Sequence, residues 1–154
     1  MVDCLRGVER PSGKLGPLLI DIAHERALEQ LVGDAAMAQA DLAERHETSV
    51  AFDEQGLRAL DRIIAVLRAN RPQPGSPAFV EAVRAIGAVL TVVMLKNGDS
   101  IIAFRAKDSG TNTSLFVGQS KAEYFPFHHV HKCLTGEDTL EGYWRGFVKD
   151  TKRG

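Results

Sequence analysis

Residues 76–96 predict a helix that is apolar on more than half of its circumference, and this helix limits the possible folds most strongly. Ser76 is a suitable N-cap, and Pro77 follows at the first helical position, where a missing N–H costs nothing. The apolar residues that follow are Phe79, Val80, Val83, Ile86, Leu90, Val93 and Met94. Because so wide an apolar surface must be covered by other elements, we expect this helix at the centre of the core.

Glycine inside this helix is a second constraint. Gly87 lies within the apolar segment, where glycine costs about 1 kcal/mol relative to alanine. A close approach of another element to the helix would explain that cost. We therefore expect another element to approach the helix closely at Gly87.

Two further helical segments precede residue 76. Apolar residues recur at intervals of three and four over residues 17–47, and Asp41 and Arg45 form a supporting i,i+4 pair. The half of this segment after Gly33 is Ala-rich and weakly amphipathic, a composition that a partner helix would tolerate. The next helix begins after Asp53, a suitable N-cap, and ends before the proline-containing linker 71–75.

The chain after the central helix predicts short strands. Residues 100–106, 113–118 and 122–125 are rich in β-branched and aromatic residues and are separated by polar turns. They predict an antiparallel meander. Pro126 then favours a helix that ends before Gly136, and Asp138 with Glu141 has the spacing of a capping box for a last helix.

Together these elements predict an α+β fold. We expect three or four N-terminal helices packed on a small three-stranded antiparallel sheet, followed by two short C-terminal helices. Residues 17–154 form a single domain in this prediction, with 17–47 as a helical N-terminal extension and 52–147 as the core. Residues 1–16 show no periodicity and are predicted to be a flexible arm.

Charge and cysteine content exclude several classes of function. A net charge of −1 over 154 residues gives no field that would gather nucleic acid or an anionic membrane. Two cysteines are too few for a disulfide framework. The N-terminus is charged from its third residue, and no uninterrupted run of 18 apolar residues occurs, so we expect a cytoplasmic protein.

The order of these elements resembles small bacterial domains of unknown function. The resemblance covers about residues 52–147 and rests on Ile86-Gly87-Ala88-Val89-Leu90, Phe125-Pro126-Phe127 leading to Val130 and Lys132, and Gly136. It implies helices packed on a small sheet and assigns no chemistry. Non-histidine polar residues often occupy the positions of His128, His129 and His131 in that pattern, which speaks against a shared role for these histidines.

The segment from Tyr124 to Leu134 contains the densest group of possible metal ligands. On a helix, His128 and His131 are spaced i,i+3, and His129 and Cys133 are spaced i,i+4. The two pairs point in different directions, so other residues would have to complete a site. As a strand, His129, His131 and Cys133 would share one face. We favour the helix and hence no metal; zinc bound by these four residues is the alternative.

Two short motifs resemble catalytic signatures. Asp108-Ser109-Gly110-Thr111 is similar to the aspartic protease signature, but these residues are also typical of a hairpin turn. Gly118-Gln119-Ser120-Lys121-Ala122 nearly matches a nucleophile elbow but lacks its last glycine. A Cys133–His129 nucleophile pair would place the thiol at a helix C-terminus, where the helix dipole opposes thiolate formation.

These exclusions leave binding as the leading hypothesis. The apolar stripe of residues 17–47 exceeds what one small sheet needs, so that helix is predicted to contact a protein partner or a second copy in a homodimer. The candidate contact residues are Leu19, Ile20, Leu28, Leu31, Tyr143 and Trp144. The alternatives are a metal-binding protein or metal-dependent enzyme that uses the histidine segment, and a small-molecule pocket beside residues 126–134.

Overall fold

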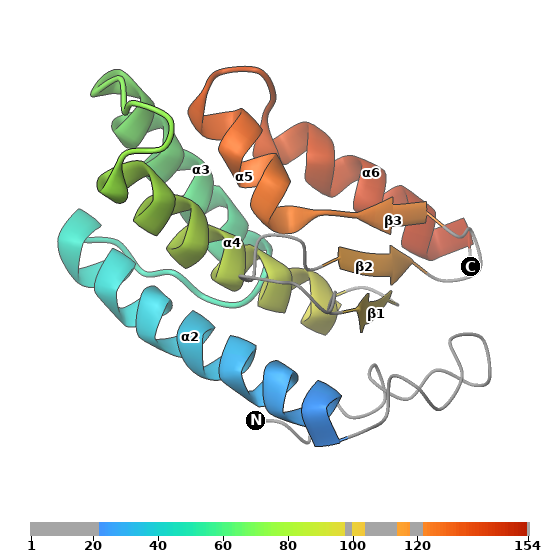
Figure 1. Cartoon of the computed structure of the whole chain (residues 1–154). Coiled ribbons are helices and arrows are strands. Elements are labelled where there is room, and N and C mark those ends of the chain that lie inside the picture. The colour runs from blue at the N-terminus through green and yellow to red at the C-terminus, as the bar shows by residue number, and fades with distance from the viewer. Residues whose placement is uncertain (1–21, 98–99, 104–113, 118–121, 154) are drawn as a thin grey trace.

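The computed structural model describes residues 22–97, 100–103, 114–117 and 122–153 (Figure 1). Its helices are α2 (Ile22–His46), α3 (Glu54–Ala69), α4 (Pro77–Asn97), α5 (Pro126–Leu134) and α6 (Leu140–Arg153). Its strands are β1 (Ser100–Ala103), β2 (Ser114–Val117) and β3 (Ala122–Tyr124). The predicted arm 1–16 lies outside the described residues.

The domain is mostly helical, and the predicted α+β class is wrong. Three short strands pair antiparallel in the order β1-β2-β3, with Ile101 opposite Phe116 and Leu115 opposite Tyr124. Strands of three or four residues offer too small a face for several helices to pack on. The buried core of the described residues is instead built from all five helices, to which β2 adds Leu115.

The prediction of a central helix is confirmed. Helix α4 lies between α2 and α5 and contacts both extensively, while α3 packs against it from a third direction (Figure 1). Its residues from Ile86 to Leu95 are all buried. By length and composition α4 would also suit a membrane span, but most of its apolar window is buried by other parts of the domain, as in the core helix of a soluble fold.

The predicted close approach at Gly87 is also confirmed. A Cβ added there would lie 2.3 Å from Cδ1 of Phe127, which belongs to α5. The missing side chain therefore lets the Phe127 ring rest on the backbone of α4. This contact fixes the position of α5, the helix that contains the histidines.

Local signals set several helix boundaries as predicted. Asp53 caps α3 by accepting a 2.9 Å hydrogen bond from Gly56 N–H, and Ser76 Oγ accepts one from Phe79 N–H at 3.2 Å. Helix α5 begins at Pro126. The capping box at Asp138 is wrong, because α6 begins at Leu140 and the side chain of Thr139 accepts the hydrogen bond from Gly142 N–H.

Candidate functional site

Helix α5 distributes the histidine segment over different environments. His128 is exposed, His131 is partly buried, and His129 and Cys133 are buried at 6% and 1% exposure. The rings of His128 and His131 stack with their centroids 6.3 Å apart, and His131 also meets the edge of Phe79. The four side chains that we considered as metal ligands therefore do not share one exposed face.

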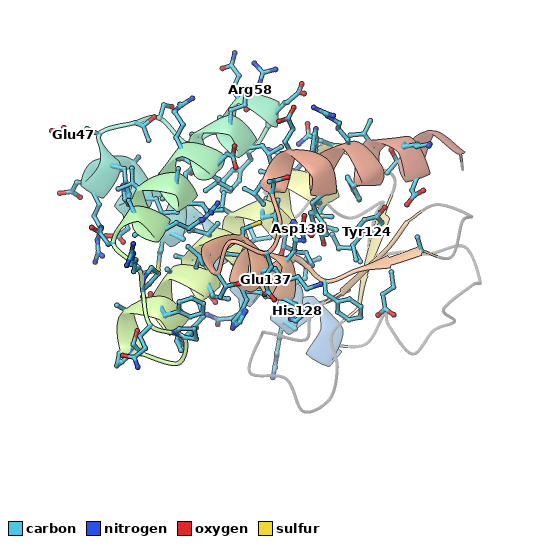
Figure 2. The ribbon with its side chains drawn as sticks, turned by 90° about the horizontal axis from the view of Figure 1, so that it is seen from above. Glu47, Arg58, Tyr124, His128, Glu137 and Asp138 are labelled. Carbon is cyan, nitrogen blue, oxygen red and sulfur yellow. The ribbon has the colours of Figure 1, made fainter. Side chains whose placement is uncertain are left out.

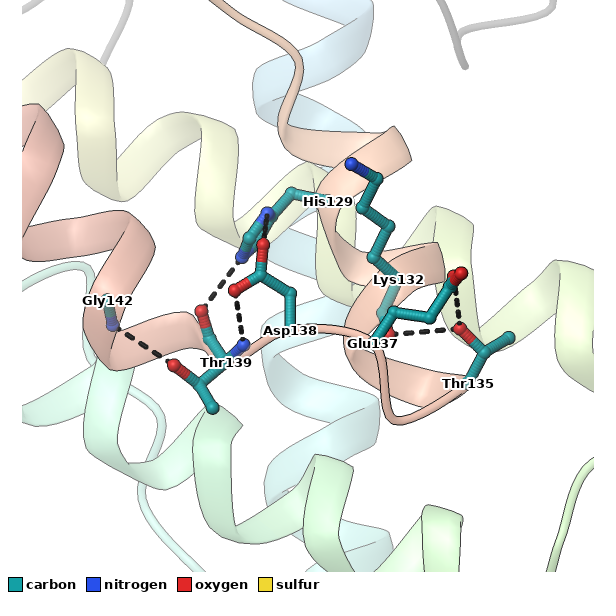
Figure 3. A network of polar contacts seen from close by, with 7 residues as sticks. All are labelled: His129, Lys132, Thr135, Glu137, Asp138, Thr139 and Gly142. Carbon is teal, nitrogen blue, oxygen red and sulfur yellow. Dashed lines mark hydrogen bonds and ion pairs between the residues drawn. The ribbon is translucent and has the colours of Figure 1, made fainter.

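His129 links α5 to the start of α6 by side-chain contacts. Its Nε2 lies 2.9 Å from the carbonyl oxygen of Thr139, so this nitrogen carries the hydrogen and donates it (Figure 3). Its Nδ1 lies 3.6 Å from Oδ2 of Asp138, whose other oxygen accepts a hydrogen bond from Thr139 N–H. The ring stacks on Tyr143 with centroids 3.8 Å apart. All these contacts join elements of one domain, which is a structural role.

Burial lowers the pKa of His129 below its usual 6.5, and nearby Lys132 and His128 lower it further. The Thr139 carbonyl and the Asp138 carboxylate act in the opposite direction without reversing the shift. The imidazole is therefore neutral at physiological pH, which agrees with the single proton that the Thr139 contact requires.

This pKa shift predicts a loss of stability in acid. The unfolded chain binds a proton at His129 more readily than the folded chain, so the free energy of unfolding falls as pH drops below about 6.5. One group contributes at most about 1.4 kcal/mol per pH unit. Urea unfolding from slightly alkaline to mildly acidic pH should show a weaker dependence in His129→Gln than in wild type. The control Val66→Ala, at an exposed and uncharged position on α3, should retain the wild-type dependence; equal pH profiles for all three proteins would contradict the assignment.

The Cys133 thiol is not poised for nucleophilic chemistry. Burial raises its pKa to about 12, and the negative charges of Asp138 and Asp61 contribute to the rise. A thiolate is needed both for attack on a substrate and for zinc coordination. Within the described residues, no group of three or more His, Cys, Asp or Glu side chains is arranged to hold a metal ion.

The two motifs that resemble catalytic signatures fall on parts of the chain that the structure does not describe. Asp108-Ser109-Gly110-Thr111 lies outside the described residues, and so do Gly118, Gln119, Ser120 and Lys121 of the second motif.

The predicted partner-binding residues belong largely to the core of the single chain. Leu28 and Leu31 are 1% and 7% exposed and face the interior on α2. Trp144 is 9% exposed, and Tyr143 is partly buried, with a buried hydroxyl that has no hydrogen-bond partner in the described structure. Leu19 and Ile20 lie outside the described residues. The apolar stripe of α2 is thus covered by α4. The sequence pattern had indicated a partner chain for that stripe instead.

Other apolar side chains remain at the surface. Met37 on α2 is 75% exposed, Val66 on α3 is 53%, Val80 on α4 is 45%, and Phe125 before α5 is 37%. Sequence periodicity missed Met37 because it lies opposite the apolar stripe of α2. No second apolar period marks it in the sequence, because the neighbouring positions on that face are Gln30, Gly33, Ala40 and Glu44.

A polar hollow of about 370 Å³ lies where the chain passes from α2 to α3. Its lining residues are Thr48, Ser49, Ala51, Gln55, Arg58 and Arg62. Figure 2 shows Arg58 at the outer edge of α3, away from His128 on α5. Both arginine side chains are exposed, so the hollow is open to solvent and positively charged along one side.

The chain matches no protein-family model, no curated protein and no solved structure. The resemblance over residues 52–147 therefore rests on the residue pattern alone. Only the surface and the buried groups of this chain itself bear on its function.

Proposed function

We propose that this protein is a non-catalytic, cytoplasmic binding module that acts by contacting another protein chain, either a second copy of itself or a different protein. The observation that carries this proposal is Met37, which is 75% exposed in the middle of a long helix. Methionine is flexible and polarisable, and it is used often on adaptable binding surfaces. Single exposed apolar residues are common, and the residues around Met37 distinguish this one.

Those surroundings favour a protein partner. The inner face of α2 packs against α4 and is buried at residues such as Leu28 and Ala35, which are 1% and 0% exposed. Its outer face around Met37 contains Gly33 and Ala40, both exposed, so the backbone there is open to close approach. A rigid helix with one buried face and one smooth outer face is well suited to pack against another helix.

The state of the reactive groups supports a non-catalytic role. His129 uses Nε2 to hold Thr139, and the Cys133 thiol is buried with a raised pKa. Metal binding at His128, His129, His131 and Cys133 would require His129 to release Thr139 and the buried thiol to ionise. The binding proposal requires neither change, so we prefer it to the zinc alternative.

Site-specific photo-cross-linking tests this function. A benzophenone amino acid at position 37 of the full chain, in the cells that naturally make it, should give a discrete cross-linked protein on irradiation. The same amino acid at exposed Lys149 on α6 is the matched control and should give much less of that product. Identification by mass spectrometry would distinguish a second copy from another protein. If positions 37 and 149 gave the same diffuse background, the proposed function would be rejected.

A further inference from the structure

Six exposed residues form a stripe along the outer face of α2. The residues Arg26, Gln30, Gly33, Met37, Ala40 and Glu44 follow one another at intervals of four, three, four, three and four, and all six are exposed. This is the spacing of the a and d positions of a coiled coil. From Arg26 to Glu44 the stripe is about 27 Å long at 1.5 Å per residue.

The stripe is complementary to itself in one orientation. If two copies of α2 lie antiparallel and cross at the level of Ala35, Arg26 faces Glu44, Gln30 faces Ala40, and Gly33 faces Met37. Each a position then lies opposite a d position of the other helix. A parallel arrangement would instead place Arg26 against Arg26 and Glu44 against Glu44, so charge selects the antiparallel orientation.

The centre of this arrangement also fits sterically. A Cβ added at Gly33 would meet no atom within 4 Å in the described chain, so the space above Gly33 is open. Met37 is the largest apolar side chain of the stripe and is 75% exposed. In the antiparallel pair, each Met37 rests in the open space over Gly33 of the other copy, as a knob fits into a hole.

We propose that a second copy of this chain covers the outer face of α2, in an antiparallel helix pair with its two-fold axis at the level of Ala35. This inference rests on the proposed function and names its partner. The interface is isologous, so each of its contacts except those on the axis occurs twice.

One feature opposes the pairing and limits its strength. The two copies of Asp34 come near the axis, where their like charges repel. Gln30 Nε2 donates a 2.9 Å hydrogen bond to Asp34 Oδ1 within each chain, which partly compensates this charge. We therefore expect a reversible dimer that dissociates on dilution.

Charge exchange tests the register directly. The variants Arg26→Glu and Glu44→Arg each place two like-charge contacts at the ends of their own homodimer. A one-to-one mixture allows a heterodimer in which both end contacts have opposite charges again. Sedimentation equilibrium of the full chain should show association weakened on the order of tenfold in each variant alone, since the terminal pairs are exposed and worth modest energies. The mixture should regain the wild-type association constant.

Neither substitution is expected to destabilise the fold, so weaker association can be attributed to the interface. Arg26→Glu adds an acidic residue near the N-terminal end of α2, and Glu44→Arg adds a basic residue near its C-terminal end. Both signs are favourable for the helix dipole. Arg84→Glu on the exposed side of α4 is the matched charge reversal and should leave association unchanged.

Three outcomes would overturn the inference. A wild-type chain that stays monomeric at several hundred micromolar excludes the second copy, although the proposed function stands if position 37 cross-links to another protein. A cross-link from position 37 to residues 1–21 of the same chain would show that the face is covered internally. Finally, a mixture that associates no more tightly than its two components would exclude the antiparallel register.

Discussion

Leu28→Ala is expected to lower the free energy of unfolding by about 2–5 kcal/mol, the range for truncating a buried leucine. Leu28 is 1% exposed and belongs to the core that α2 forms with α4. Removing its isobutyl group deletes apolar contacts and leaves a cavity that a close-packed helix pair cannot fully close. Urea unfolding followed by circular dichroism measures this loss.

Met37→Ala is the matched control on the same helix. Because Met37 is 75% exposed, this substitution should change the free energy of unfolding of the dilute monomer by no more than about 0.5 kcal/mol. It should instead weaken self-association. A stable Leu28→Ala chain with weakened association would mean that Leu28 contacts a partner, as its sequence pattern alone had indicated, and that the inner and outer faces of α2 are assigned wrongly.

Gly56→Ala is expected to destabilise the domain by about 3 kcal/mol, the upper end of the usual cost of forcing extra atoms into a packed site. A Cβ at Gly56 would lie 1.5 Å from the carbonyl oxygen of Ala51, which is backbone and has no alternative rotamer. To relieve this overlap, the segment before α3 must move away. That movement also strains the cap in which Asp53 accepts the Gly56 N–H.

Gly33→Ala is the corresponding control. Gly33 is helical and exposed, and an added Cβ meets no described atom within 4 Å, so the substitution should stabilise the dilute monomer by up to about 1 kcal/mol. Thermal and urea unfolding measures the free energy of unfolding of both variants. If Gly56→Ala were as stable as Gly33→Ala, the tight passage of the chain from residue 51 into α3 would be contradicted.

The helix boundaries were the part of the fold that local chemistry could predict. Asp53, the Ser76-Pro77 pair and Pro126 act through hydrogen bonds and ring geometry within a few residues, and each begins a helix where expected. The last helix shows the limit of this reasoning. Asp138 and Thr139 are both good caps. The chain uses Thr139, while Asp138 faces the buried ring of His129, a tertiary contact that the sequence does not reveal.

The fold class was wrong for a related reason. The apolar circumference of α4 required neighbours, but its composition could not identify them. We assigned part of that role to a sheet, whereas α2 and α5 take most of it and the strands remain short. The same ambiguity affected Leu28 and Leu31: an apolar stripe shows that a face is covered, not whether its own chain or another chain covers it.

For the histidine segment, the sequence was sufficient to predict a helix and not sufficient to separate the four side chains by environment. The i,i+3 and i,i+4 spacings describe neighbours on α5 alone. The His129 ring is covered by Tyr143, and the contact of Phe127 with Gly87 holds α5 against α4. Both contacts join residues that are distant along the chain.

The most direct test of the account is the change of NMR spectra on dilution of the wild-type chain. Assigned amide signals and the Met37 methyl signal should shift with concentration along the outer face of α2, at Arg26, Gln30, Gly33, Met37, Ala40 and Glu44, while Leu28 and Ala35 on the inner face change much less. If these outer-face signals were independent of concentration, or if the shifts were centred on His128 and His131 instead, a second copy of the chain would not cover the outer face of α2.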